Sequence, residues 1–222
     1  MGEYSTALSY LEKTLQIQKY ALPSNHPSLA STYSNMGVLY HKTGDYEEAI
    51  SLLQQAIGIH ENSTSMHHPN LAISYANMAL MYSEIGQYDQ ALSCHDKALE
   101  IQGKTLPQDH PDLAVSYTNI GLLYDQLDDC PKALDHHRKA LEIFSKTLPA
   151  NHPHLAATCN NIGEVYFKMK DYEHALSYYE KAVKILQDSL HSNHSHLTVI
   201  KENIEKTKLM YAQLNQNKHT TN

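Results

Sequence analysis

A spacing of 42 residues is the feature of this sequence that most constrains its fold. The dipeptide His-Pro recurs at that interval, and a last copy carries serine in place of proline. The positions are His26-Pro27, His68-Pro69, His110-Pro111, His152-Pro153 and His194-Ser195. A fixed period of roughly 20–50 residues indicates a repeat protein, in which each unit buries its apolar face against the next. The sequence therefore predicts a stack of similar units.

Each unit has the pattern of two helices. In the third unit, five small or apolar residues are spaced so that they share one helical face: Leu113, Tyr117, Ile120, Gly121 and Tyr124. In the first and second units, the breaks "TGDY" and "IGQY" follow the corresponding helix, where Gly44 and Gly86 can adopt the left-handed conformation that ends a helix. The sequence therefore predicts antiparallel helical hairpins. Prolines between hairpins stop one helix and suit the first turn of the next.

The repeat text resembles a known family. Small residues recur with a tyrosine three positions later and two alanines in the second helix, as in Gly37, Tyr40, Ala49 and Ala56. This pattern resembles the tetratricopeptide repeat, and the 42-residue period resembles its form in kinesin light chains and nephrocystin-like proteins. The resemblance implies an all-α fold, a right-handed α-solenoid of stacked antiparallel helix pairs.

The repeat phase divides the chain into segments, which we expect to form one solenoid domain. The expected segments are a second helix of a truncated N-terminal repeat (1–25), repeats 1 to 4 (26–67, 68–109, 110–151 and 152–193), a degenerate capping helix (194–216) and a frayed tail (217–222). Glu205 and Lys208 stand where a small residue and a tyrosine are expected, which indicates a polar helix that covers the end of the stack.

Composition excludes several classes of partner. The formal net charge is −7 and Arg138 is the one arginine, so no basic patch is available to neutralise nucleic-acid phosphates. No apolar run reaches the length of a membrane span. Three cysteines fit neither a disulfide framework nor a zinc motif. We expect a cytoplasmic protein that binds no nucleic acid, does not insert into a membrane and uses no cofactor.

The many histidines favour a structural role over a metal site. Equivalent side chains on packed helices lie at least roughly 8–10 Å apart, too far to share one ion. We expect the periodic histidines to support helix starts, beside caps supplied by Asn25, Asp109, Asn151 and Asn193. Cys94, His95, His136 and His137 form the one non-periodic cluster, and packing is favoured there because no carboxylate completes a ligand set.

A ladder of asparagines is the candidate binding site. The members are Asn35, Asn77, Asn119, Asn161 and Asn203. Asparagine is a mediocre helix former, and a position two residues before Gly37 lies off the buried stripe. A carboxamide offers the donor and acceptor that one peptide unit requires, and helices roughly 10 Å apart match about three residues of an extended strand. The alternative is that these asparagines tie one helix to the next without any ligand.

The residues that flank the ladder limit the ligand. Lys42 and Lys168 are basic while Glu84 and Asp125 are acidic, so the groove has mixed sign. Apolar surface between the asparagines comes from Val38, Leu80 and Leu122. The pattern favours an internal extended segment with spaced apolar anchors, because no cluster of basic residues is present to clamp a terminal carboxylate.

We therefore expect a non-catalytic scaffold that binds an extended peptide in its concave groove. The resemblance implies cargo adaptors or kinesin heavy chain as partners, and a place at microtubules and the cytoskeleton, although the heavy chain normally needs a coiled-coil segment that is not evident here. No phosphate loop, nucleophile elbow or HExxH helix indicates an enzyme. Two alternatives stay open: a recognition module of a larger protein, for example one with an ADP-ribosyltransferase-like catalytic domain, and a self-associating scaffold.

Overall fold

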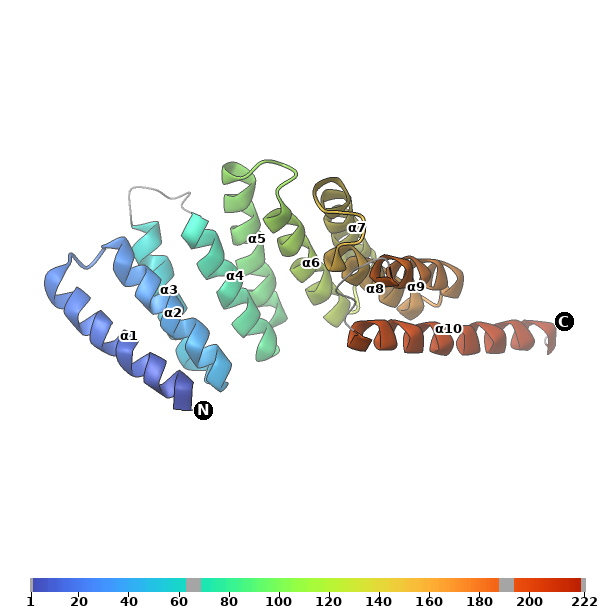
Figure 1. Cartoon of the computed structure of the whole chain (residues 1–222), viewed down its shortest axis with the longest axis horizontal. Helices are drawn as coiled ribbons and strands as arrows, with labels where there is room; N and C mark the ends of the chain where they lie inside the picture. Colours follow the sequence, from blue (N-terminus) through green and yellow to red (C-terminus); the bar gives the residue numbers. More distant parts are fainter. Residues whose placement is uncertain (1, 63–68, 188–193, 221–222) are drawn as a thin grey trace. The chain divides into compact units, whose positions relative to one another are not determined.

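The structure is a computed structural model that describes residues 2–62, 69–187 and 194–220. Within these ranges the chain forms ten α-helices and no strand (Figure 1). The all-α prediction is therefore confirmed. The chain divides into two compact units, Met1–Gln108 and Asp109–Asn222, which are described separately here.

The first unit contains five helices that pack in the order of the chain. These are α1 (Gly2–Ala21), α2 (Pro27–Thr43), α3 (Tyr46–Glu61), α4 (Pro69–Glu84) and α5 (Tyr88–Thr105). Helices α2 and α3 form one antiparallel pair, and α4 and α5 form the next. Helix α1 packs against α2, and α3 packs against α4, so α2, α3 and α4 each lie between their neighbours in sequence.

The second unit repeats this order. Its helices are α6 (Pro111–Gln126), α7 (Cys130–Thr147), α8 (Pro153–Lys168), α9 (Tyr172–Gln187) and α10 (His194–Thr220). The pairs are α6 with α7 and α8 with α9, and α10 packs against α9. Ile200 and Ile204 of α10 join the buried core, whereas Glu205 and Lys208 are exposed. Helix α10 continues to Thr220, past the predicted boundary at residue 216, because no proline or glycine interrupts it.

The first helices begin at a proline, and the preceding histidine is the N-cap. His26, His110 and His152 have extended backbones, as is usual before proline. In each, imidazole Nδ1 accepts a hydrogen bond of 3.2 Å from the backbone N–H two residues on. A cap on these helices was predicted for the residue before the histidine, and that prediction is wrong for Asn25, Asp109 and Asn151. His68 and Asn193, which belong to the same two ladders, lie outside the described residues.

Proline explains why the histidine takes this place. Its ring fixes φ and has no N–H, so it suits the first helical position and pushes the residue before it out of the helix. That residue is the histidine. Its ring nitrogen can then satisfy one of the backbone donors that every helix start leaves unpaired.

A residue with a left-handed backbone conformation lies at the end of the first helix of each hairpin, in the turn before the second helix. Gly44 and Gly86 have φ of +88° and +75°, as the turn pattern predicts. The equivalent residues in the second unit are Asp128 and Lys170, with φ of 56° and 60°. The same turn therefore forms without glycine, although a side chain makes this conformation less favourable.

The two helices of a hairpin approach closely where the first carries glycine. A Cβ added at Gly163 would lie 2.6 Å from the ring of Tyr179, and one at Gly121 would lie 2.6 Å from the ring of His137. At Gly37 the nearest atom would be Leu53 Cγ at 3.0 Å. Glycine at these three positions leaves room for the side chain on the second helix, and the second repeat has Ala79 at the equivalent position. The helices of the described residues include none that is long and apolar enough to cross a membrane.

Candidate functional site

An exposed stripe on α4 combines one asparagine with two apolar side chains. Ile73, Asn77 and Leu80 are four and three residues apart, so they share one helical face. Ile73 is 55% exposed and Leu80 is 43% exposed, while Asn77 is half-buried between them. The helix therefore presents a carboxamide framed by apolar surface.

Helix α6 of the second unit carries the same stripe. Val115 and Leu122 are 41% and 40% exposed, and the half-buried Asn119 lies between them. Large apolar residues on a helix surface are more informative when they recur in register than when they are scattered singly. The recurrence in both units makes this face the strongest candidate for a binding surface.

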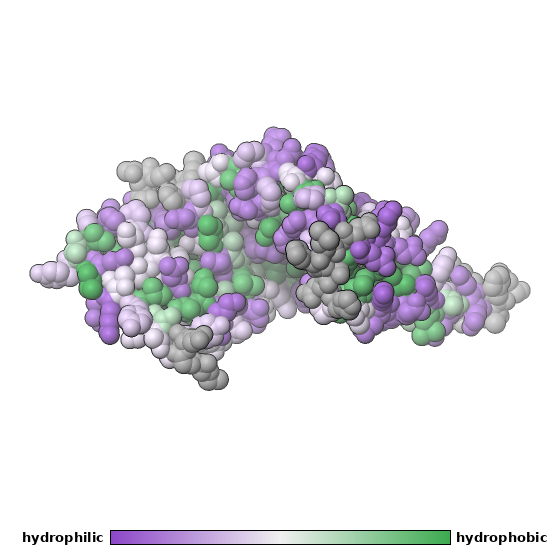
Figure 2. Space-filling view, viewed as in Figure 1, coloured by the Kyte–Doolittle hydropathy of each residue, from purple (hydrophilic) through white to green (hydrophobic). Residues whose placement is uncertain are grey.

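Other first helices keep the asparagine but vary its neighbours. The stripe is Ser31, Asn35 and Val38 on α2, Ala157, Asn161 and Glu164 on α8, and Val199, Asn203 and Lys206 on α10. Asn35 is exposed and Val38 is half-buried. On the face shown in Figure 2, hydrophobic residues lie among hydrophilic ones over both units. The stripe is thus apolar on α4 and α6 and more polar on α8 and α10.

Four of the five asparagines have side chains that make no hydrogen bond with the described residues. They are Asn35, Asn77, Asn119 and Asn161. Asn203 differs, because its Nδ2 donates to Asn160 Oδ1 and Glu164 Oε1, each at 3.3 Å. The helix-tying alternative therefore describes Asn203, which joins α10 to α8. In the other four, donor and acceptor are free for a ligand or water.

The predicted groove cations have different surroundings. Lys168 Nζ of α8 lies 2.9 Å from Asp125 Oδ1 and donates to the Asp125 carbonyl oxygen at 2.8 Å. This pair links the first helices of two adjacent repeats, and Asp125 is largely buried. Lys42 is exposed and takes part in no ion pair of the described residues. Lys42 is therefore available to an acidic partner, whereas Lys168 already has a carboxylate.

Two small cavities lie between α8 and α10. One has a volume of about 170 Å³ and is lined by Ala157, Asn161, Leu186, Val199 and Ile200, among others. The other has about 260 Å³ and is lined by Glu164, Phe167, Asn203 and Lys206, among others. The first can hold an apolar side chain beside a carboxamide. The second is lined by both polar and aromatic side chains, with Lys206 Nζ 4.9 Å from the centre of the Phe167 ring.

Sequence reasoning singled out the asparagines and their C-terminal neighbours but left Ile73, Val115 and Val199 out of the site. The sequence does indicate these three residues, because each lies four residues before an asparagine and is apolar on a helical face that should be polar. The cavities between α8 and α10 had no such signal, because they depend on how two helices meet.

The histidine cluster gives no sign of metal binding. Among the residues that the structure describes, no group of three or more His, Cys, Asp or Glu side chains could hold an ion. His95 and His137 are buried, and burial lowers the pKa of each imidazole to about 4. Cys94 and Cys159 are also buried, which raises the pKa of their thiols. These side chains are packed in the hairpins and do not line the stripe.

Comparison with known families and structures agrees with this geometry. A family model described as tetratricopeptide repeat matches residues 1–62, 70–146 and 126–188, which is well over half of the chain. No curated protein matches the sequence significantly.

Several solved structures resemble the chain. The repeats of a putative kinesin light chain from Podosopora anserina, described as nearly identical TPR-like repeats, align at 26% identity with a TM-score of 0.74, over 86% of this chain and 90% of that one. BtubC (BKLC) from P. vanneervenii aligns at 20% identity and a TM-score of 0.75, over 96% and 90%. The apo form of RapI aligns at 22% and 0.77, over 97% of this chain and 60% of that chain. These similarities confirm the α-solenoid fold class.

Proposed function

Because this chain belongs to the tetratricopeptide-repeat family, we propose that it is a non-catalytic scaffold that binds an extended peptide segment along the stripes of its first helices. Repeats of this family and the solenoids that resemble the chain support a protein-interaction role. The peptide ligand, its place in the concave groove and a cargo-adaptor role like that of kinesin light chains are our proposal.

The observation that carries the proposal is the unpaired carboxamide between two exposed apolar side chains on α4 and on α6. A half-buried asparagine without an intramolecular partner is costly unless water or a ligand satisfies it. A peptide backbone supplies one donor and one acceptor per residue, which matches a carboxamide. Apolar side chains of the same peptide would contact Ile73 and Leu80, or Val115 and Leu122.

The proposal predicts a peptide of mixed character. The stripes of α4 and α6 favour apolar anchors, and the exposed Lys42 favours an acidic residue near α2. The cavity between α8 and α10 that Val199 and Asn161 line would take one further apolar side chain. A partner of this kind is an internal segment, because a chain terminus would bring a charge that the apolar stripes cannot pair.

The test begins with a selection of binding peptides from a random library displayed on phage, followed by calorimetry on the best peptide. We expect Asn77→Ala with Asn119→Ala to weaken binding about tenfold or more, since each lost hydrogen bond is worth about 1 kcal/mol. Gln90→Ala, an exposed change on the second helix α5, is the matched control and should bind as the unmodified protein does. Unchanged affinity in the double variant would contradict the asparagine ladder as the binding site.

A further inference from the structure

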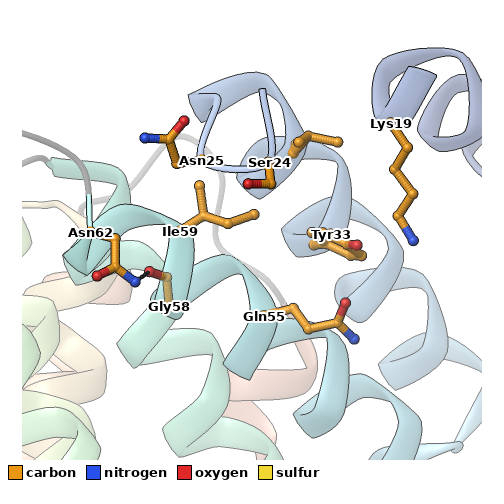
Figure 3. Close-up of a pocket in the computed structure, with 9 residues that line it drawn as sticks. Lys19, Ser24, Asn25, Tyr33, Gln55, Gly58, Ile59 and Asn62 are labelled. Carbon is orange, nitrogen blue, oxygen red and sulfur yellow. Dashed lines mark hydrogen bonds between the residues drawn. The ribbon is translucent and has the colours of Figure 1, made fainter. Parts of the chain in front are cut away.

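A larger cavity lies in the first unit, where α1 and the loop after it meet α2 and α3. Its volume is about 630 Å³, within the range of small-ligand sites. Figure 3 shows Lys19 and Tyr33 on one side of the opening and Asn25, Ile59 and Asn62 on the other. The lining contains one cation and no carboxylate.

The next repeat contains the equivalent cavity, formed by α3, α4 and α5. Its lining residues lie 42 positions further on, but its volume is only about 210 Å³. There the charged groups satisfy one another: Tyr75 Oη donates to Glu61 Oε1 at 2.5 Å, and Lys104 Nζ lies 2.6 Å from Glu100 Oε1. Lys97 Nζ also lies 3.5 Å from Tyr75 Oη, so side chains of the protein itself pair within this cavity and leave it smaller.

Four substitutions between equivalent lining positions account for the difference in charge: Lys19 for Glu61, Gln55 for Lys97, Gly58 for Glu100 and Asn62 for Lys104. Lys19 stands at the position of Glu61, so the carboxylate that binds the tyrosine hydroxyl is replaced by an ammonium group. Tyr33 is only 7% exposed, yet its hydroxyl makes no hydrogen bond with the described residues. Lys19 Nζ lies 5.6 Å from the centre of the Tyr33 ring and belongs to no ion pair of the described residues. A donor and a cation thus lie together without an anion.

The substitution at the position of Glu100 opens the space. Gly58 stands at the position of Glu100, in the interior of α3. Its backbone is helical and an added Cβ would meet no atom within 4 Å, so neither conformation nor packing requires glycine. Glycine within a helix is unfavourable relative to other residues. Its effect here is to leave the cavity open beside Leu29 and Ile59.

We propose that this cavity binds the carboxylate of an acidic side chain in a peptide segment of a protein partner. The ligand carboxylate takes the place that Glu61 occupies in the next repeat: it accepts the hydrogen bond of the Tyr33 hydroxyl and pairs with Lys19. An apolar side chain beside the acidic residue packs on Leu29 and Ile59, where Gly58 leaves room. The partner segment therefore contains adjacent acidic and apolar residues.

This site is separate from the asparagine stripe. Tyr33 and Asn35 are two residues apart on α2, so their side chains leave the helix about 200° apart. A peptide on the stripe does not reach the cavity by the same face of the helix. The proposal therefore does not depend on the function proposed above, and its variants leave Asn35 and Asn77 unchanged.

The experiment is a titration of the ¹⁵N-labelled protein with the peptide acetyl-Leu-Glu-Leu-amide, followed by NMR. We expect shifts at the backbone amides of Ser24, Asn25 and Ile59, and about tenfold weaker binding for the peptide with Gln in place of Glu, because a charge-assisted hydrogen bond is lost. Lys19→Glu and Gly58→Glu introduce the residues that the next repeat has at the equivalent positions, Glu61 and Glu100. Each variant should abolish the shifts. Gly58→Glu fills open space on a helix, so it preserves the fold.

The converse variant tests sufficiency. Glu61→Lys with Lys97→Gln, Glu100→Gly and Lys104→Asn gives the cavity of the next repeat the residues that line the first cavity at these positions, and we expect this variant to gain binding of the Glu peptide. Equal shifts with the Gln peptide, or shifts that survive Gly58→Glu, would overturn the proposal. A second probe is free isovalerate, a small branched carboxylic acid. Shifts caused by isovalerate but not by the Glu peptide would also overturn the proposal, since they would indicate a small acid as the ligand.

Discussion

At the scale of single residues, two buried histidines stand out because they lack the partners that buried polar groups normally have. Both ring nitrogens of His137 and Nδ1 of His95 are buried without a hydrogen bond in the described part of the chain. Burial lowers the pKa of both imidazoles to about 4; for His137, Asp125 opposes this shift and His136 adds to it. Each ring is therefore neutral in the folded protein at neutral pH.

This burial predicts that the protein is less stable in mild acid. The folded pKa of about 4 lies below the unfolded value of 6.5, so the unfolded chain binds more protons between these limits. The contribution of the two neutral histidines to the unfolding free energy is fully present above about pH 6.5. It is lost as the pH falls toward 4. At pH 5 each histidine should lower the unfolding free energy by about 2 kcal/mol relative to pH 7. Urea denaturation at the two pH values measures the difference.

The chain itself supplies the control for this prediction. Leucine occupies the equivalent position in the first repeat, at Leu53, so His95→Leu with His137→Leu should fold. The double variant should lose most of the difference between pH 7 and pH 5. If the double variant retains the full difference, other groups cause the acid sensitivity.

At the scale of helices, close packing within each hairpin depends on glycine opposite a large side chain. Tyr179 is almost fully buried, and its ring lies directly against Gly163. A planar ring in a filled core has little room to move, because protein interiors are close-packed. The distance between α8 and α9 is thus set by one residue on each helix.

Gly163→Ala should lower the unfolding free energy by about 1–3 kcal/mol, because its Cβ would overlap the Tyr179 ring. The matched control is Gly121→Ala opposite His137. The second repeat already combines Ala79 with His95 at these positions, so the framework accepts that pair and the loss should be smaller. Thermal denaturation of both variants compares them. A Gly163→Ala variant as stable as the unmodified protein would show that the hairpin can widen without cost.

Helix positions were predictable, whereas several details of helix ends were not. The His-Pro period placed the starts of α2, α6 and α8, because proline's geometry acts locally. The turns at Gly44 and Gly86 were predictable because the freedom of glycine to adopt positive φ is also a local property. Those at Asp128 and Lys170 were not, since a left-handed backbone is unfavourable for lysine and only occasional for aspartate. The cap was assigned to Asn25 rather than His26 because capping preferences rank asparagine far above histidine, while the geometry before proline decides the position.

Less of the site could be predicted. The asparagines were evident because they recur in register, but the pairing of Asn203 with Asn160 and Glu164 was not, since it depends on how α10 meets α8. The cavity at Tyr33 depends on exchanges at four positions, in α1, in α3 and at the C-cap of α3, and these positions are far apart in sequence. Such a combination becomes visible only when packed helices bring the positions together.

At the scale of the whole chain, two compact units each hold a core of their own. The core of the first includes Leu15, Leu29 and Met36, and that of the second includes Ile162 and Leu186. Repeat arrays gain stability mainly from neighbouring elements rather than from distant ones. The assignment of all repeats to one solenoid domain stays a prediction.

The separate cores predict that fragments 1–108 and 109–222 fold independently. Each should keep the helical circular-dichroism signal expected from its share of the sequence and unfold cooperatively in urea, since each retains its own buried pairs of helices. Circular dichroism and denaturation of the purified fragments provide the measurement. A fragment without cooperative unfolding would show that its core needs the rest of the chain.

The imidazole caps have a consequence for proton placement. A ring nitrogen that accepts a hydrogen bond cannot also carry a proton, so His26, His110 and His152 must each hold theirs on Nε2 when they cap a helix. Asparagine, the commoner N-cap residue, has no such pair of tautomers. Helix geometry in this family of hairpins therefore dictates the chemical form of three aromatic rings, and nitrogen spectroscopy can read that form directly.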